Sequence, residues 1–312
     1  MLSTRFFRFF RHLNWNALKR TVAHIFQRRL IGLSAEIAYN AMLSLFPAIL
    51  AMLTAIGLFE ESLQATFKAL AVQLSKVAPD EAMVLIRDFS GQITQTKNTG
   101  LFSISFVVAI WAASGALNAA MVALDQIHQI PPEQTRPFWK AKLVSLGLTI
   151  GTILLLVTAS FLVFISDLLL GFFILRSNSL SPWLGSFILS VWRLLSWPIA
   201  LGIVASAFGF VYRYGPSRWD PGMPLMPGAV LAAVLWAIAS GLFRTYVANF
   251  GNYNQAYGAV GAVIVLMLWL YMSALVLLIG DQLNVTVGET MRSRSKSASQ
   301  SVEPPKPEIG QI

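Results

Sequence analysis

The feature that most constrains this chain is a series of long apolar segments. Each contains about twenty or more residues, enough for an α-helix to cross roughly 30 Å of hydrocarbon. The alternating pattern of a membrane β-barrel is missing. We therefore predict an all-α polytopic membrane protein. Its bundle is predicted to contain six transmembrane helices, at about residues 33–58, 101–124, 142–165, 188–212, 225–248 and 258–284.

The composition agrees with a membrane protein. Of the 312 residues, 56% are hydrophobic and 12% are charged, whereas a soluble domain has about 25% charged residues. The chain has no cysteine, which excludes disulfides, thiolate catalysis and cysteine-bound metals. The first thirty residues are basic and aromatic and lack the continuous apolar core of a signal peptide, so we expect no cleavable signal.

The placement of Lys and Arg predicts the orientation. The formal net charge is +9. If the N-terminus is inside, sixteen basic residues fall on the cytoplasmic side and five on the opposite side. Because cytoplasmic segments are enriched in Lys and Arg, both termini are predicted to lie in the cytoplasm.

The N-terminal arm, residues 1–32, is predicted to lie on the membrane surface as a basic amphipathic segment. Aromatic residues alternate with arginines there, and each basic residue near anionic headgroups contributes about 1 kcal/mol of attraction. Membrane lipids are therefore the expected partner, and nucleic acid is not expected. The predicted surface residues are Arg5, Arg8, Arg11, Arg28 and Arg29.

Three segments outside the predicted spans have their own patterns. Residues 62–95 show helical periodicity on both sides of a Pro-Asp-Glu sequence and predict a helical hairpin on the outer face. Residues 166–187 either prolong the third span or return along the surface. The tail, residues 286–312, is rich in Ser, Pro and charge and is predicted to be disordered.

A polar stripe follows the first predicted span. Glu36, Asn40 and Ser44 are four residues apart, with Tyr39 beside them, so they share one face of a helix. An ionisable side chain facing lipid costs about 2.5–3.5 kcal/mol. The stripe is therefore predicted to face the bundle interior or water, as a candidate substrate-binding surface.

The same span leaves two questions open. Pro47 removes a helical hydrogen bond and favours a kink or a local opening. Glu36 has an alternative role as a helix anchor, in a salt bridge with Arg28 or Arg29. Under that alternative the stripe binds nothing.

Further polar residues lie in or beside the other spans. Ser114 and Asn118 are four residues apart and point either to a site or to a packing seam with an interhelical hydrogen bond. Two arginines within spans are explained by snorkelling, or by pairing one of them with Glu36. The remaining candidates for the bundle interior are Arg193, Arg244, Tyr257, Asp281 and Asn284.

Several blocks, in order from about residue 35 to 285, resemble the YihY/BrkB family of bacterial inner-membrane proteins. They include AEIAYNAMLSLFPAIL, WAASGALNAAMVALDQIH, MPGAVLAAVLWAIASGLFRTYV and YGAVGAVIVLMLWLYMSALVLLIGDQLN. The resemblance implies a six-span bundle in the bacterial inner (plasma) membrane. It also implies a Gly-Ala-Glu-Leu-Asn sequence at the end of the last span, where this chain has Asp281 and Gln282 in place of Ala and Glu.

Function is less constrained than architecture. Some family members carry a ribonuclease BN label, but the chain shows no metal-ligand cluster, nucleophile elbow or phosphate loop, and we expect neither an enzyme nor a cofactor. Asp125 and His128 are its only acid and imidazole neighbours. The leading hypothesis is a transporter or translocator of a lipid or small solute. The alternative is a non-transporting envelope scaffold or integrity protein, and a homo-oligomer is left open.

Overall fold

The computed structural model describes residues 9, 14–74, 99–176, 182–218, 223, 225–249 and 252–300. Within these ranges every regular element is helical, which confirms the all-α prediction. One short 3-10 turn covers Pro132–Gln134. The α-helices are α2 (Trp15–Gln27), α3 (Leu30–Leu74), α5 (Thr99–Ile127), α6 (Phe138–Arg176), α7 (Pro182–Tyr214), α8 (Met226–Asn249) and α9 (Asn252–Gln300).

Five of the described helices contain a segment that is long and apolar enough to cross a membrane, which confirms a protein with several candidate spans. The segments are Leu30–Met52, Phe102–Ile127, Phe138–Leu155, Met226–Ala248 and Val260–Arg292. The predicted span at 188–212 lies within α7, whose described apolar segment, Pro198–Tyr214, is shorter than the other five. The structure thus gives five such spans among the described residues, one fewer than the sequence predicts.

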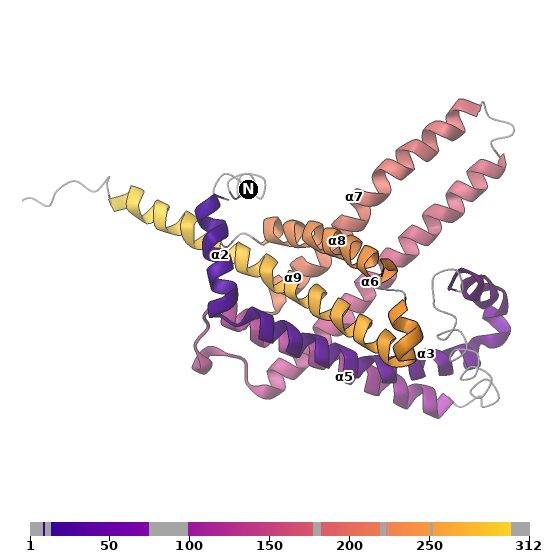
Figure 1. Ribbon diagram of the computed structural model, residues 1–312, viewed down its shortest axis with the longest axis horizontal. Helices are drawn as coiled ribbons and strands as arrows, with labels where there is room; N and C mark the ends of the chain where they lie inside the picture. Colours follow the sequence, from indigo (N-terminus) through magenta and orange to yellow (C-terminus); the bar gives the residue numbers. More distant parts are fainter. Residues whose placement is uncertain are drawn as a thin grey trace, which may run out of the picture.

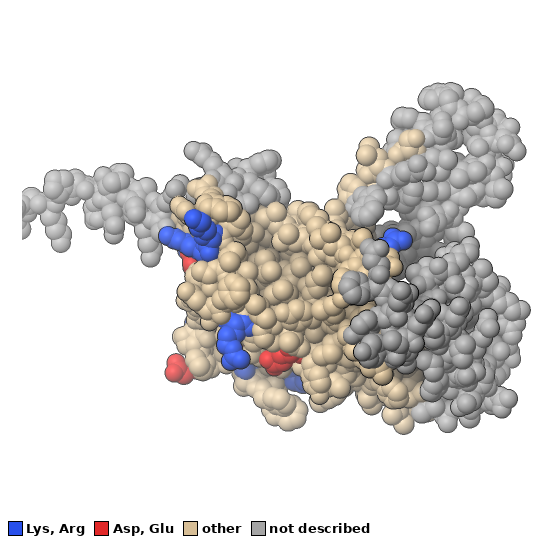
Figure 2. Space-filling model, in the orientation of Figure 1, with Lys and Arg blue, Asp and Glu red and all other residues tan. Residues whose placement is uncertain are grey.

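Helix α9 crosses the middle of the molecule (Figure 1), and α2, α3, α5 and α8 pack against it. The junction of α2 and α3, the end of α5 and the C-terminal part of α9 all lie at the same end of the bundle (Figure 1). The helices α6 and α7 form a long hairpin that leads away from the other helices (Figure 1). Most charged side chains on the face shown in Figure 2 lie over α2 and the beginning of α3.

Several helices are longer than the predicted spans. The first predicted limb of the outer hairpin continues α3 without a break as far as Leu74, and residues 75–98 lie outside the described residues. The apolar segment after the third predicted span prolongs α6 to Arg176, which decides between the two predicted paths for that part of the chain.

The prediction of disorder from residue 286 is wrong for the first part of the tail. Helix α9 continues to Gln300, and Thr286 and Val287 are 1% and 0% exposed. The composition misleads here because residues 289–300 extend a helix that already exists. Extension avoids the cost of nucleation, so a polar sequence with few apolar residues remains helical.

Small side chains let the helices approach closely. Alanines fill the buried faces of α5 (Ala116, Ala119, Ala120, Ala123) and α8 (Ala229, Ala232, Ala233), a pattern typical of packed transmembrane helices. At the crossing of α8 and α9, a Cβ added to Gly280 would lie 2.5 Å from the Cβ of Ala232. Any larger residue at position 280 would therefore push the two helices apart.

Helix α5 ends in a Schellman motif. The N–H of Gln129 donates to the carbonyl of Gln126 at 3.2 Å, and that of Ile130 donates to the carbonyl of Asp125 at 3.0 Å. This motif needs a left-handed residue, and Gln129 supplies it with a φ of 53°. The turn ends α5 beside His128 and directs the following loop back along the bundle (Figure 1).

We expect Gln129→Gly to stabilise the protein. A left-handed conformation costs an L-residue roughly 1–2 kcal/mol and costs glycine almost nothing. Melting temperature in detergent should rise for Gln129→Gly. It should fall for the control, Gln126→Gly, because residue 126 is within the helix, where glycine costs about 1 kcal/mol. A fall for both variants would contradict the motif.

Candidate functional site

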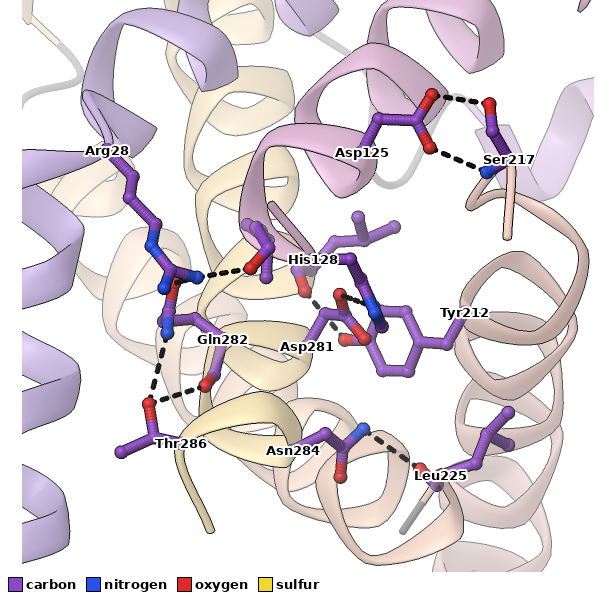
Figure 3. Close-up of polar contacts among 12 residues, drawn as sticks. Arg28, Asp125, His128, Tyr212, Ser217, Leu225, Asp281, Gln282, Asn284 and Thr286 are labelled. Carbon is purple, nitrogen blue, oxygen red and sulfur yellow. Dashed lines mark hydrogen bonds and ion pairs between the residues drawn. The ribbon is translucent and has the colours of Figure 1, made fainter. Parts of the chain in front are cut away.

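Polar side chains from several helices meet at the end of the bundle that holds α2 and the C-terminal part of α9 (Figure 3). Residues 281–288 of α9 are all buried, so every face of this helical segment contacts protein. Buried polar groups need hydrogen-bond partners. We define the α9 polar cluster as Asp281, Gln282, Asn284 and Thr286 together with the groups that they contact; these four residues are at most 2% exposed.

The first contact of the α9 polar cluster joins α5 to α9. Nε2 of His128 lies 2.9 Å from Oδ2 of Asp281, and the two side chains are 6% and 2% exposed. Tyr212 of α7 lies beside this pair (Figure 3) and donates from its hydroxyl to the carbonyl of Leu277 on α9 at 2.6 Å. Because a buried charge is costly without a partner, the pair holds the end of α5 against α9.

The second contact joins the turn between α2 and α3 to the same region. The guanidinium of Arg28 donates to the carbonyl of Ile127, at the end of α5, and to Oε1 of Gln282 at 3.1 Å. A cation at a helix C-terminus is favourable because the last carbonyls carry a partial negative charge. Nε2 of Gln282 donates to Oγ1 of Thr286 at 3.0 Å and to Nδ1 of His24 on α2 at 3.3 Å. Burial lowers the pKa of Arg28.

We expect His24 to make the docking of α2 depend on pH. Burial lowers the pKa of His24 below its usual 6.5, and nearby Arg28 and Arg20 lower it further, while Glu289 opposes them. Neutral His24 accepts the hydrogen bond from Gln282, whereas protonated His24 cannot. Below pH 6.5 the unfolded chain therefore binds more protons at this residue than the folded protein, and acid destabilises the folded state.

We expect the melting temperature of the wild type to fall between about pH 7.5 and about pH 5.5, the range in which an ordinary His gains its charge. His24→Gln keeps a hydrogen-bond acceptor and cannot be protonated, so the melting temperature of this variant should fall less over the same pH range. The measurement is the difference in pH dependence between the two proteins, which removes the contributions of other histidines. Equal slopes would show that His24 is not the responsible group.

The third contact joins α9 to the first turn of α8. Oδ1 of Asn284 accepts from the N–H of Gly228 at 2.9 Å, and its Nδ2 donates to the carbonyl of Leu225 at 3.1 Å. The first N–H groups of a helix have no partner within the helix, so Asn284 satisfies one of them. A Cβ on Gly228 would lie 2.2 Å from Oδ1 of Asn284, which explains the glycine.

Two loops meet next to the α9 polar cluster. The N–H and hydroxyl of Ser217 both donate to the carboxylate of Asp125, each at 2.6 Å. The guanidinium of Arg136 donates to three backbone carbonyls at the end of α7, those of Tyr214, Gly215 and Pro216. The loop after α5 and the loop after α7 are therefore held together by charged side chains.

A cavity of about 300 Å³ opens between these loops and α5. Asn118 reaches it from α5, and neither its amide nitrogen nor its oxygen has a hydrogen-bond partner among the described residues. The charged residues at the cavity, Asp125 and Arg136, already bind backbone and hydroxyl groups. The lining residues are Asn118, Met121, Val122, Asp125, Gln126, Ile130, Pro132, Thr135, Arg136, Ala141 and Ser217.

The stripe on the first span contributes little to this site. Glu36 and Tyr39 are exposed, and Ser44 donates to the carbonyl of Ala41 in its own helix at 2.6 Å. Asn40 also donates within its helix, to the carbonyl of Glu36 at 2.9 Å. Its Oδ1 lies against α5, 3.1 Å from where a Cβ of Gly115 would be. Pro47 lies inside α3, which continues past it.

Glu36 lacks three of the ion-pair partners considered for it, and the fourth, Arg193, has no described side chain. Among the residues that the structure describes, Glu36 forms no ion pair with Arg28, Arg29 or Arg244. Arg28 was predicted at the membrane surface and instead turns inward to Gln282, because α5 and α9 offer it acceptors there. Arg29 and Arg244 are exposed.

Some predicted residues lie where the structure gives no side-chain description. These are Arg5, Arg8 and Arg11 of the arm, Arg193 and Tyr257. Phe9, another residue of the arm, is described and does not face lipid. It is fully buried and packs with Ala17 of α2 and with Leu283 and Val287 of α9.

The predicted pair Ser114 and Asn118 divides between two surroundings. Ser114 is buried and accepts a hydrogen bond from Nζ of Lys142 on α6 at 2.6 Å. This is an interhelical hydrogen bond, as expected if Ser114 belongs to a packing seam. Asn118 lines the cavity. The sequence singles out Asp281 and Asn284 but does not reveal their partners, since His128, Gly228 and Leu225 are distant in sequence.

The sequence profile of the virulence factor BrkB family matches residues 21–304. The chain belongs to this family. YfkH of Bacillus subtilis, named a ribonuclease-like protein, is 34% identical over 254 residues, which cover 80% of this chain and 87% of YfkH. A UPF0761 membrane protein of Alteromonas mediterranea is 26% identical over 268 residues, 84% of each chain. One from Tolumonas auensis is 25% identical over 271 residues, 87% of this chain and 85% of that protein. No solved structure matches.

Membership of the BrkB family confirms the resemblance noted in the sequence and identifies a multi-pass membrane protein with bacterial relatives. The departure at residues 281 and 282 now has a physical meaning. Arg28 donates to Gln282, at the position where the resemblance implies a glutamate. The carboxylate has moved to the preceding residue, Asp281, where it meets His128. Asp281 therefore pairs with His128 at the end of α5, while Arg28 binds the neutral amide of Gln282.

Proposed function

We propose that this BrkB-family protein is a transporter of a small solute, located in the bacterial inner membrane with both termini in the cytoplasm. The observation that carries the proposal is the cavity of about 300 Å³ beside Asn118. Known small-molecule sites occupy about 300–1,000 Å³ and combine apolar walls with a few polar groups. The cavity is at the small end of this range, which favours a small solute over a complete lipid.

The surroundings of the cavity suit the cytoplasmic mouth of such a transporter. Its walls are the loops after α5 and α7, at the end of the bundle that also holds α2 and the C-terminal part of α9 (Figure 1). The excess of Lys and Arg at this end favours the cytoplasm. In this proposal α7 supplies the sixth span, since its 33 residues are about 50 Å long.

The amide of Asn118 is the group proposed to select the solute. It offers two donors and an acceptor, and it lies in the cavity while the neighbouring charges are occupied by the two loops. A neutral or zwitterionic polar solute would therefore gain more from this cavity than a strongly charged one.

A thermal-stability screen of the detergent-purified protein tests the proposal. It covers metabolites, ions, lipids and a short RNA. A bound ligand at a hundred times its dissociation constant stabilises by about 2.7 kcal/mol. We expect a solute that stabilises the wild type and fails to stabilise Ala141→Phe, which fills the cavity. Gly147→Ala, on the same helix where an added Cβ contacts nothing within 4 Å, is the control and should respond as the wild type does.

The solute found in this way is then measured for entry into proteoliposomes. Uptake by the wild type and none by Ala141→Phe is the result expected of a transporter. A solute that binds without crossing the bilayer would contradict transport, and equal binding by wild type and Ala141→Phe would contradict the cavity as its site.

A scaffold function is the second candidate, and the outward face of α2 favours it. Trp15, Leu18, Val22 and Phe26 are between 44% and 68% exposed and recur at helical spacing, so they share one apolar face. Lys19 lies at its margin, with its ammonium 5.8 Å from the centroid of the Trp15 ring. Under this alternative, removing residues 1–29 impairs function and filling the cavity does not.

We propose no ribonuclease activity, although YfkH carries that word in its name. Among the described residues no group of three or more His, Asp or Glu could hold a metal ion. Asp125 binds Ser217, and His128 is buried against Asp281. Asp125 lines the cavity, but both of its carboxylate oxygens accept from Ser217, and His128 is not among the residues that line the cavity.

A further inference from the structure

An ammonium group that forms no ion pair with any described carboxylate lies between α5 and α6. Nζ of Lys142, in the first turns of α6, donates to Oγ of Ser114 at 2.6 Å and to the carbonyl of Trp111 at 3.3 Å. It also lies 4.0 Å from the centroid of the Trp111 ring. None of these three residues lines the cavity proposed above, so they mark a separate place on the molecule.

The neighbours of Lys142 fix its position without neutralising its charge. Ser114 and Trp111 are uncharged, and among the described residues Lys142 forms no ion pair with a carboxylate. An ammonium has three N–H donors, and two of them are used here. A charged group at the edge of a membrane-spanning segment is a candidate for function, because it is costly to keep there without a partner.

The surface beside Lys142 is apolar and uncovered. Phe138, Trp139 and Leu143 are 71%, 73% and 69% exposed, and Trp111 on α5 is 54% exposed. Trp139 is at the beginning of the α6 span, where a tryptophan is typical of the level of the lipid headgroups. A dissolved anion would gain nothing from these side chains, whereas a lipid could place its acyl chains against them and its headgroup at the ammonium.

We propose that the ammonium of Lys142, held by Ser114 and Trp111, binds the phosphate of an anionic phospholipid. The lipid belongs to the leaflet at the end of the bundle that holds the loop between α5 and α6. Lys142 donates its third N–H to a phosphate oxygen, Ser114 and Trp111 hold the ammonium in place, and the exposed first turns of α6 contact the acyl chains. The proposal does not depend on transport.

The test compares phosphatidylglycerol and phosphatidylcholine with the same acyl chains, each added to the full-length protein in mild detergent. Melting temperature is followed as a function of lipid concentration, and inorganic phosphate forms a third series. Phosphatidylglycerol should stabilise the wild type more than phosphatidylcholine does, and inorganic phosphate should have no effect. Lys142→Gln should raise the half-saturating concentration of phosphatidylglycerol about fivefold.

Lys140→Gln is the matched control, since it removes an equal charge from an exposed residue two positions away and should leave the half-saturating concentration unchanged. Ser114→Ala keeps the charge but removes its anchor, and it gives an intermediate value; it replaces Lys142→Gln if that variant does not fold. The proposal is overturned if Lys142→Gln, or Ser114→Ala in its place, binds phosphatidylglycerol as the wild type does. It is also overturned if both lysine variants weaken binding equally, or if inorganic phosphate stabilises as much as the lipid.

Discussion

Asp281→Leu is expected to destabilise the protein by about 3–5 kcal/mol, the usual cost of removing one partner from a buried ion pair. The reason is that His128, 6% exposed, keeps its polar nitrogen and loses its partner 2.9 Å away. The imidazole cannot reach water while α5 and α9 remain packed. Melting temperature and the resistance to denaturing detergent should both fall clearly.

A double-mutant cycle separates this pair from general damage to the core. His128→Leu alone should also destabilise, because it leaves Asp281 without its partner in a place that is 2% exposed. The combination of Asp281→Leu and His128→Leu buries two apolar side chains side by side and should cost clearly less than the sum of the single changes. Coupled neighbours show interaction energies of about 0.5–3 kcal/mol. Strict additivity would contradict a direct contact between the two side chains.

Gly228→Ala should destabilise the protein by a similar amount to Asp281→Leu. The added Cβ would lie 2.2 Å, 2.3 Å and 2.5 Å from three atoms of the Asn284 side-chain amide, so the amide must leave its position. Both of its hydrogen bonds, to the N–H of Gly228 and the carbonyl of Leu225, are then lost in a buried place. Each buried group left unsatisfied costs about 1–3 kcal/mol. Melting temperature is again the measurement.

Gly241→Ala is the control for this change because residue 241 lies on the same helix and an added Cβ meets nothing within 4 Å. Alanine in an open helical position is better than glycine by about 0.5–1 kcal/mol, so Gly241→Ala should be neutral or slightly stabilising. If Gly228→Ala were equally harmless, the contact between Asn284 and the first turn of α8 would not exist as described.

The predictions from sequence that succeeded depend on local properties. Apolar segments long enough to cross a membrane follow from composition and length, and the structure has five of them among the described residues. The prediction for residues 286–300 failed because local composition does not reveal that Thr286 and Val287 are enclosed by other helices. The extent of α9 depends on contacts made by the residues before it.

In the candidate site, too, local properties could be predicted from the sequence and contacts between helices could not. Asp281 and Asn284 are identifiable as polar residues at the end of an apolar helix, but their partners come from α5 and α8 and depend on how the helices cross. Arg28 shows the difficulty most clearly. Its place in a basic cluster predicted lipid contact, whereas the end of α5 and Gln282 lie within its reach and bind it. A signal was available in Gly228 and Gly280, because glycines in packed helices often mark a close approach.

The most direct test of the proposed cavity uses the absence of cysteine from the chain. Asn118→Cys is labelled with a membrane-impermeant maleimide in inside-out and right-side-out vesicles, with Val107→Cys, on the same helix and 64% exposed on its apolar surface, as the lipid-facing control. We predict rapid labelling of residue 118 in inside-out vesicles alone, slowed by the solute that the screen identifies. Labelling only from the opposite side, or labelling as slow as that of residue 107 from both sides, would contradict a solute cavity that opens to the cytoplasm.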